Sequence, residues 1–582
     1  MAWRDRLLTP LIGHSKASAE RATRRYLEDI DSSSCLKHLN KAVGQLLNGF
    51  DDVNKIFSIY VTTNSRGKRV LNRDSFARYI TPKQPENPAV TNCVPLLWRI
   101  FSIGAYFPFS ASTTASGQVS GPSNEPDIDL EGFRRAFTFL VLRGYELLGA
   151  KSDGRPLSTA TEKSYSDKVP RLARIIFESM STLSPQSAPQ SQTPQEPLRL
   201  QDFKDTIAFT QPIMNENMHH GRATVADREF EAAAHRLLLA DHGPAVGGSC
   251  AVSKTDLQSL IQLLLLQRVR DRRCKDGLSY YDMYQRSGDI MFSHFVPGID
   301  EASRASEFAS AFIAYQFGGS KDAVTWDAFK DWCSECPSFI FHFFQLWASI
   351  FSPVTTAPQT SRADSESPLP TSTTNTLCFL NIAQFVSGAQ PNYRFHQNEY
   401  QLHFDLLASA LVANLATTPK LGVEELHETI TVSDWFHVIL IWGEDLEVEG
   451  KGTSRLIVAF TSPPEKVLWR PEGKRTVQYI WRTSAVQLEP ELALADGGGM
   501  SASIEAGSLK LRSRGVAVKG CTSMKLDLAE RVVDIGGLII GLAGDSSGMR
   551  SEGTLVMRMR LTDLKCYRLP GVSSKITRSG DR

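Results

Sequence analysis

The stretch SDWFHVILIWGED, residues 433 to 445, decides the fold class of the C-terminal part of the chain. In an extended segment Val438 and Leu440 would lie on one face and Ile439 and Ile441 on the other. A strand that is apolar on both faces belongs in the middle of a sheet that is covered on both sides. The sequence therefore predicts a β-rich domain around this segment.

Two more stretches in this part have the pattern of strands. Residues 455 to 460 follow the turn-rich sequence EVEGKG and are mostly apolar. Over residues 555 to 561, Leu and Met at every second position alternate with Val and Arg. This alternation predicts a strand with one buried face and one wetter face.

The sequence before residue 352 has the periodicity of helices instead. Apolar residues recur at intervals of three and four positions, as at Phe133, Phe137 and Val141. The clearest segments of this kind are residues 36–50, 130–149, 254–273 and 305–317. We therefore expect an α+β multidomain protein, with an all-α N-terminal half joined to a β-rich C-terminal half.

Low-complexity stretches mark the expected domain boundaries. Residues 184–197, SPQSAPQSQTPQEP, and residues 352–376 contain too few apolar side chains to bury a core, so both are expected to be flexible. The expected units are an N-terminal tail (1–29), a helical unit (30–183), a linker (184–197), a second helical unit (198–351), a disordered linker (352–376), a β domain (377–571) and a C-terminal tail (572–582).

Composition is that of a globular cytoplasmic protein. Lys plus Arg number 64 and Asp plus Glu 63, so no attraction of the whole molecule to nucleic acid is expected. The nine cysteines show no recurring spacing and are expected to be reduced thiols. No run of 18 apolar residues predicts a transmembrane segment, which leaves at most peripheral membrane association.

The N-terminal segment carries charges inside its apolar stretch, which argues against a secretory signal, and Ala2 argues against N-myristoylation. Two interpretations remain for residues 1–29: a frayed start of the first domain, or a weak amphipathic helix at a surface.

A five-residue spacing recurs in the helical half, where an apolar residue is followed five positions later by an aromatic residue at a helix start. The four instances are Ile128–Phe133, Leu198–Phe203, Ile290–Phe295 and Val324–Phe329. The same spacing separates the β-bridge residue of an EF-hand loop from the first aromatic residue of the exiting helix. Any amphipathic helical protein also yields such spacings, so EF-hand-like pairs and ordinary helix starts both remain open.

These loops lack the oxygen ligands that calcium needs at positions 1, 3, 5 and 12. Those places hold Phe317, Gly319, Lys321 and Ala328 before Phe329; Met283, Gln285, Ser287 and His294 before Phe295; and Gly121, Ser123, Glu125 and Gly132 around Ile128. A further stretch, TTNSRGKRVLNRDSF (62–76), keeps Gly67 but has Arg66 and Arg73 where acids belong. We therefore predict no metal site and no response to calcium.

No stretch has a recognisable catalytic or cofactor motif, so we predict no catalytic, cofactor-binding or metal-binding residues. Gly497, Gly498 and Gly499 lack the Lys and Ser/Thr of a phosphate loop and are expected to form a tight turn. Cys333 and Cys336 have redox or half-zinc spacing, but His342 alone does not complete a zinc site, so buried thiols are expected.

Two other polar groupings have simple interpretations. His219 and His220 lack the spacing of a metalloprotease motif. The basic run Arg268, Arg270, Arg272, Arg273 and Lys275 is expected to be a solvated helix end, with contact to an acidic protein or a lipid as the alternative.

Several stretches resemble a known family. Residues 324–352, VTWDAFKDWCSECPSFIFHFFQLWASIFS, and residues 96–109, LLWRIFSIGAYFPF, resemble segments of fungal proteins of the restriction of telomere capping family. Landmarks of the TLDc domain of that family then follow in order at residues 433–445, 455–470, 476–490, 495–515 and 559–571. Asp563 keeps its place in the closing strand, whereas the next four residues, Leu564 to Tyr567, are substituted, and the early S-x-x-D-G-x-S turn is not recognisable.

The resemblance implies both a fold and a function. The fold is an EF-hand-like helical half followed by a TLDc-like antiparallel β-sandwich flanked by helices. The function is that of a non-enzymatic regulatory or adaptor protein without cofactors, connected with oxidative stress and with the vacuolar-type proton pump (V-ATPase). Its partners would be proteins such as peripheral-sector subunits of that pump, and its location cytoplasmic or peripheral at the vacuole membrane. The alternative is an enzyme, such as a hydrolase with a dispersed active site, because a catalytic triad needs no local motif.

Overall fold

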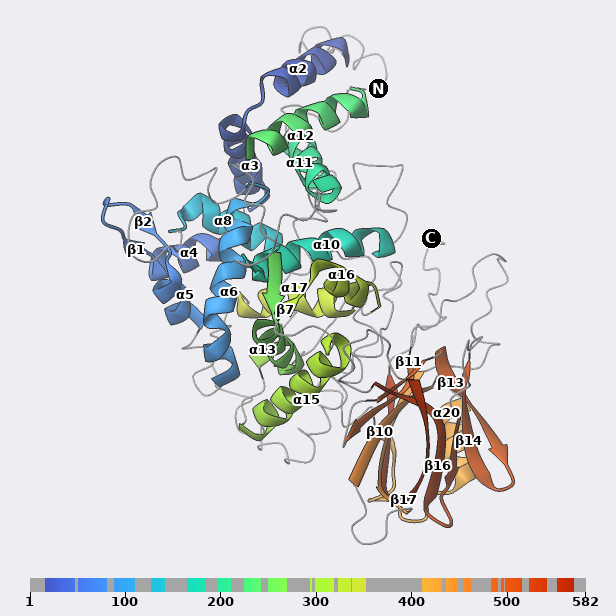
Figure 1. Cartoon of the computed structure of the whole chain (residues 1–582). Helices are drawn as coiled ribbons and strands as arrows, with labels where there is room; N and C mark the ends of the chain where they lie inside the picture. The colour runs from blue at the N-terminus through green and yellow to red at the C-terminus, as the bar shows by residue number, and fades with distance from the viewer. Residues whose placement is uncertain are drawn as a thin grey trace, which may run out of the picture.

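A computed structural model gives the fold of the chain (Figure 1). It describes residues 16–47, 51–80, 88–109, 127–141, 165–183, 196–210, 225–241, 250–268, 294–295, 299–318, 323–335, 338–351, 411–431, 436–446, 454–461, 483–489, 493–496, 498–514, 523–541 and 552–569.

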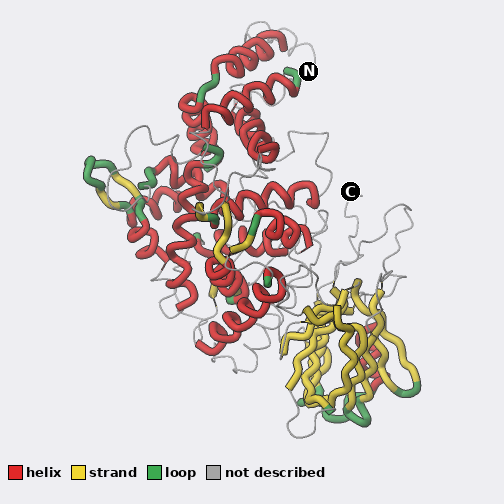
Figure 2. The backbone as a smooth tube through the Cα atoms, viewed as in Figure 1, coloured by secondary structure: helices red, strands yellow, loops and turns green. Residues whose placement is uncertain are grey.

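The N-terminal part is mainly helical, as the periodicity predicted (Figure 2). Its helices are α2 (Lys16–Asp29), α3 (Ser32–Leu46), α4 (Asp51–Tyr60), α5 (Arg73–Ile80), α6 (Pro88–Tyr106), α8 (Leu130–Leu140), α10 (Tyr165–Met180), α11 (Glu196–Thr210), α12 (Asp227–Asp241), α13 (Lys254–Leu265), α15 (Ile299–Phe317), α16 (Trp326–Glu335) and α17 (Ser338–Ile350). Most of them pack around one core rich in Phe and Trp, which includes the predicted helix face of Phe133, Phe137 and Val141.

Local sequence explains where several of these helices begin. Asp31 and Ser34 form a reciprocal capping box at the start of α3, in which each side chain accepts a backbone N–H of the other residue. The Asp129 side chain accepts the N–H of Gly132 at the start of α8, 2.8 Å away. These caps satisfy amide groups that a helix N-terminus otherwise leaves unpaired.

The helical half is not all-α, and this corrects the prediction. Short antiparallel pairings join its loops: β1 (Thr62–Thr63) with β2 (Arg69–Val70), β3 (Thr182–Leu183) with β4 (Cys250–Ser253), β4 with β7 (Ala323–Val324), and β5 (Gln267–Arg268) with β6 (His294–Phe295). Such pairings satisfy backbone groups where helices end.

Helices from both sides of residues 184–197 pack together. Helices α2 and α3 contact α12, and α3 also contacts α11, so these four helices share a small core of their own. Figure 1 shows them together at one end of the molecule. Residues 16–29, which we assigned to a tail, are therefore part of this four-helix unit as α2.

The C-terminal part is a single β-sheet with one described helix, α20 (Val423–Thr431). Its strands are β8 (Leu411–Asn414), β9 (Phe436–Asp445), β10 (Ser454–Thr461), β11 (Thr483–Glu489), β12 (Ala493–Asp496), β13 (Gly498–Glu505), β14 (Ser508–Arg514), β15 (Ser523–Asp527), β16 (Val532–Gly541) and β17 (Glu552–Leu569). The connections β13–β14 and β15–β16 are short hairpins, in which Gly507 and Arg531 adopt positive φ angles of 75° and 54°.

The sheet closes on itself, and a closed barrel replaces the expected β-sandwich. Seven strands form the ring β16–β15–β14–β13–β10–β9–β17, and the β16–β17 pairing closes it. The pairings are antiparallel except for β10 with β13, which meet in parallel at Thr461 and Met500. Strands β11 and β12 form a second path from β10 to β16. Closure removes sheet edges, which would otherwise expose unpaired backbone groups.

Strand β9 has the two apolar faces that the sequence predicted. Ile439 and Ile441 lie in the interior core of the barrel with residues of β14, β15 and β16. Val438 and Leu440 point the other way and belong to the Phe- and Trp-rich core of the helical half. The barrel and the helices therefore share one continuous apolar core through this side of the sheet.

The C-terminal strand also follows its predicted pattern. On β17, Met557, Met559 and Leu561 are buried while Arg558 and Arg560 are exposed. The alternation places the methionines inside the barrel and the arginines on its outer surface.

Candidate functional site

Two helix–loop–helix pairs form the centre of the helical half. In the first pair, the loop between α4 and α5 and the loop before α8 meet at Leu71 and Ile128. Each of these residues donates its N–H to the carbonyl of the other, at 2.7 and 2.9 Å. In the second pair, Val252 and Val324 are partners in the antiparallel pairing of the strands before α13 and α16. The five-residue spacings Ile128–Phe133 and Val324–Phe329 thus mark real loop-to-helix transitions.

The two other spacings do not mark such transitions. Leu198 and Phe203 both lie within α11, so no loop precedes that aromatic residue. Phe295 lies in β6 and not in a helix, and Ile290 is outside the described residues. The sequence reading missed Val252, because Leu257 takes the place of the aromatic residue five positions later. A spacing that accepted any large apolar residue would have found it.

The interior of the first loop is occupied by the side chain of Asn64. Its Oδ1 accepts the backbone N–H groups of Arg66 and Lys68, both at 3.0 Å. Its Nδ2 donates to a carboxylate oxygen of Asp127 on the facing loop, also at 3.0 Å. Gly67 completes the turn with a φ angle of 74°, a conformation that glycine adopts without strain. The loop is thus a hydrogen-bonded hairpin that is closed by its own side chain.

The second pair has one acidic side chain at the place that closes a calcium loop. Counting from Val252 as position 8, Asp256 falls at position 12. Its Oδ2 accepts a hydrogen bond from Arg99 Nη2 on α6 at 2.6 Å. The Arg99 side chain of the first pair therefore forms an ion pair with the carboxylate that a metal ion would need. This ion pair also links the two helix–loop–helix pairs.

Helix α17 fills the space between the paired helices. The ring of Trp347 lies 6.0 Å from that of Phe101, and the ring of Phe351, which directly follows α17, stacks on Tyr79 at 5.4 Å. The Tyr79 hydroxyl also donates to the Ile350 carbonyl at 3.2 Å. All seven described apolar residues of α17 are buried: Phe339, Ile340, Phe343, Phe344, Leu346, Trp347 and Ile350. The helix is therefore an integral part of the core of the helical half.

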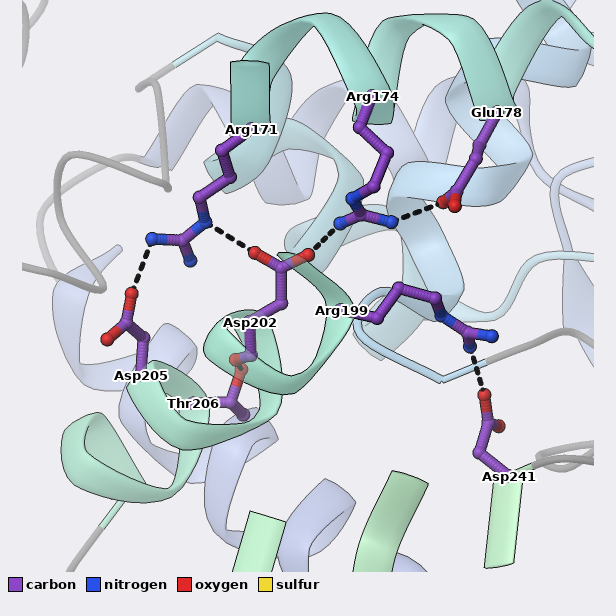
Figure 3. Close-up of polar contacts among 8 residues, drawn as sticks. All are labelled: Arg171, Arg174, Glu178, Arg199, Asp202, Asp205, Thr206 and Asp241. Atoms are coloured by element: carbon purple, nitrogen blue, oxygen red, sulfur yellow. Dashed lines mark hydrogen bonds and ion pairs between the residues drawn. The ribbon is translucent and has the colours of Figure 1, made fainter. Parts of the chain in front are cut away.

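A cluster of four ion pairs lies between α10 and α11 (Figure 3). Arg171 Nε lies 2.5 Å from one carboxylate oxygen of Asp202, and Arg174 Nη2 contacts the other oxygen. Arg171 also pairs with Asp205 at 2.5 Å, and Arg174 with Glu178 at 2.6 Å. The side chains of Arg171, Arg174 and Asp202 are 8%, 2% and 3% exposed, so the centre of the cluster is almost fully removed from water. Asp205 and Glu178 at its margin are 17% and 29% exposed.

This cluster carries a net negative charge of one, from two guanidinium and three carboxylate groups. Burial lowers the pKa of Arg174 below its usual value, and Glu178 opposes that shift. Nη2 of Arg171 and Nε of Arg174 are buried and have no hydrogen-bond partner among the residues in the described ranges. The arrangement therefore holds two helices together at a considerable cost of desolvation.

Among the described residues that line the apolar recess between α6, α8, α10 and α17, Ser179 is the one with a polar side chain. Its hydroxyl donates to the Ile176 carbonyl at 2.7 Å. The remaining lining comes from apolar residues such as Ile103, Leu140 and Phe344. The described lining of this recess contains no carboxylate, histidine, lysine or cysteine side chain.

The structure describes some of the other residues that the sequence singles out. Cys333 is buried in α16, as expected for a thiol of the core, whereas Cys336, His219 and His220 are outside the described residues. Gly498 and Gly499 open β13 directly after β12. Arg268 lies in β5, which corrects its assignment to a helix end, and the rest of that basic run is not described.

Within the described ranges, no three His, Cys, Asp or Glu side chains come close enough together to hold a metal ion. Burial raises the pKa of the Cys35 and Cys93 thiols to about 12, which makes both poor nucleophiles. No helix of the described part is long and apolar enough to span a membrane. The sequence matches no family model, and comparison with the curated proteins and with the solved structures finds no match.

Proposed function

We propose that this chain is a non-enzymatic regulatory or adaptor protein, in which an EF-hand-like helical scaffold without metal supports a β-domain that binds a protein partner. The observation that carries the proposal is the filling of the space between the helix pairs by α17. EF-hand sensors bind target helices in an open apolar groove, but here the chain supplies the occupant itself.

Burial energies support a permanent role for α17. Fully burying a large apolar side chain contributes about 1.5–3 kcal/mol, and α17 buries seven of them. Releasing the helix would therefore cost more than roughly 10 kcal/mol, which is comparable with the stability of a whole domain. The helix pairs are thus a scaffold, and partner recognition falls to exposed surfaces elsewhere on the molecule.

The β-domain is the proposed partner-binding part, because its landmarks resemble the TLDc domain. The partner that this resemblance implies is the peripheral sector of the vacuolar-type proton pump, with a role in oxidative stress tolerance and a place in the cytoplasm or at the vacuole membrane. On β17, Asp563 is half-buried, and the Lys565 ammonium lies 5.3 Å from the centre of the Trp442 ring. These half-buried side chains lie at the margin of the core that the barrel shares with the helices, and the proposed partner contacts the charged and aromatic groups at this margin.

Binding of the purified peripheral sector to the immobilised full chain at low salt tests the proposal. We expect saturable binding that the Asp563→Lys substitution weakens about tenfold or more, the loss usual for a charged interface residue. The matched control is Arg558→Gln at an exposed position of the same strand, which should bind as the wild type does. A failure of the wild-type chain to bind would remove the pump as partner.

A further inference from the structure

The buried charged cluster separates two hydrophobic cores. Apolar residues of α10, such as Ile176 and Phe177, face the large core of the helical half. Apolar residues of α11, Phe203 and Ile207, face the small core shared by α2, α3, α11 and α12. The sides that α10 and α11 turn towards each other carry Arg171, Arg174, Asp202 and Asp205 instead (Figure 3). The joint between the two bodies is therefore polar at this point.

Helix α3 connects the same two bodies along its length. Cys35, near its start, belongs to the small core, whereas Leu39 and Val43 belong to the large one. The T-shaped contact of Phe109 with Phe203, with ring centres 5.2 Å apart, is a further apolar link. Among the described residues, the four-helix unit is thus attached through α3, the Phe109–Phe203 pair, the charged cluster and Phe209 of α11, which packs against the large core.

A joint of this kind differs energetically from an apolar one. The desolvation of buried charges offsets most of their attraction, so a buried ion cluster contributes little net stability even though breaking one partner of it is costly. The buried Arg171 Nη2 and Arg174 Nε, which lack partners among the described residues, reduce the gain further. On opening, the charged groups regain water, whereas Phe209 of α11 loses its contact with the large core.

We propose that this cluster is a polar latch, which lets α2, α11, α12 and the start of α3 move away from α10 and close again as one body, with the part of α3 around Leu39 as the pivot. Relative motion is the default for units joined by small polar interfaces. The latch holds a defined closed position because the single carboxylate of Asp202 must meet two guanidinium groups at once.

Distances between two spin labels on the full chain test the latch. The labels are placed at exposed positions on either side of the joint, through Glu231→Cys on α12 and Glu307→Cys on α15. The five cysteines other than the buried Cys35, Cys93, Cys333 and Cys566 are replaced by serine. We expect one main distance and a minor longer one in the wild type. Asp202→Asn should raise the longer population about tenfold or more, because it leaves two buried guanidinium groups without their shared charge.

Two further variants make the result decisive. Glu229→Gln removes only the surface ion pair with Arg24 inside the four-helix unit, so its distances should equal those of the wild type. The triple change Arg171→Met, Arg174→Met and Asp202→Leu replaces the latch by apolar contacts and should abolish the longer population. An Asp202→Asn distribution equal to that of the wild type overturns the proposal. If the Asp202→Asn chain does not fold, the triple variant decides: a distance distribution broader than that of the wild type also overturns the proposal.

Discussion

At the scale of single residues, Gly443 is the position where the barrel tolerates no side chain. A Cβ there would lie 2.7 Å from the Arg560 carbonyl oxygen and 2.9 Å from the sulfur of Met559. The close approach accompanies a β-bulge in β17, between Leu561 and Asp563, opposite this part of β9. Backbone cannot move aside as the end of a flexible side chain can, and the neighbouring strands are fixed by the closed ring.

Gly443→Ala should therefore destabilise the protein by about 1–3 kcal/mol, the usual cost of overpacking a core. The midpoint of urea unfolding, followed by tryptophan fluorescence, measures the effect. Gly422→Ala is the matched control, because the nearest atom to its new Cβ is 3.8 Å away, at the end of the Glu424 side chain. Equal midpoints for the two variants would contradict the close approach.

His437 makes the stability of the barrel depend on pH. Burial, and to a lesser extent the charge of Arg568, lower the pKa of His437 to about 4. The unfolded chain binds a proton at this site near pH 6.5, whereas the folded chain does not until about pH 4. Stability from this group is therefore complete above pH 6.5 and falls as the pH drops towards 4, by about 3 kcal/mol in total.

Urea unfolding at pH 7 and pH 4.5 measures this dependence against that of His437→Phe. Carboxylates titrate over the same range, so the informative quantity is the difference between the two proteins. The wild type should lose about 2–3 kcal/mol more than the variant on acidification. Parallel losses in both proteins would show that His437 is protonated equally well in the folded state.

At the scale of elements, sequence periodicity predicted the helices and strands whose burial depends on near neighbours. The predicted segment 254–273 contains α13, and the predicted segment 305–317 lies within α15. The predicted strand with two apolar faces, at 436–445, is β9. Arg268 was misassigned, because only its pairing with His294, distant in the sequence, places it in a strand. Periodicity depends only on residues that are close in the sequence, so it contains no information about such a distant partner.

In the candidate loops, too, the sequence pattern left the pairing partners of the backbone undetermined. The Gly67 turn was visible in the sequence, but the bridge formed by Leu71 was not, because the loop was aligned on its glycine and not on Phe76, five residues after Leu71. The charged cluster was also invisible, since Arg171 and Asp202 come from helices on opposite sides of the predicted linker. Nothing local distinguishes a buried arginine from a solvated one.

Calcium should leave the helical half unchanged. In the first loop the oxygen of Asn64 already accepts two backbone N–H groups, and Arg66 and Lys68 would repel a cation. In the second pair Asp256 is neutralised by Arg99. Calorimetric titration of the full chain with millimolar calcium should give only heat of dilution. A dissociation constant below about 0.1 mM would mean that a coordinating loop was assigned wrongly.

At the scale of the whole molecule, the closure of the barrel lay beyond sequence reading. A sandwich and a barrel share the same strand alternation, and they differ in whether the last strand returns to pair with an earlier one. Here β17 pairs with β9 through Asp445 to Phe436 and with β16 through Val532 to Gly541. With 18 residues, β17 is long enough to pair with both β9 and β16. The length of this strand, and not the number of strands, is therefore the sequence feature that would have indicated closure.

The barrel and the helical half should not be separable. Val438, Leu440 and Val458 are fully buried, yet they point away from the interior of the barrel into the core of the helices. Figure 1 places β10 on the side of the barrel towards the helical part. A fragment of residues 377–571 would expose this side, and an exposed apolar patch of several large side chains drives association.

We therefore expect the fragment to aggregate where the full chain does not, as measured by light scattering at matched concentration. The double change Leu440→Thr and Val458→Thr should restore solubility to the fragment, because threonine keeps the β-branched shape that suits a strand and adds a hydroxyl that water can solvate. In the full chain the same double change should instead destabilise, since both hydroxyls would be buried in an apolar core. Ile439→Thr, on the inward face of the same strand, is the control that should not rescue the fragment. A fragment that stays monomeric without any substitution would show that the two halves fold independently and that the shared core contributes little to either.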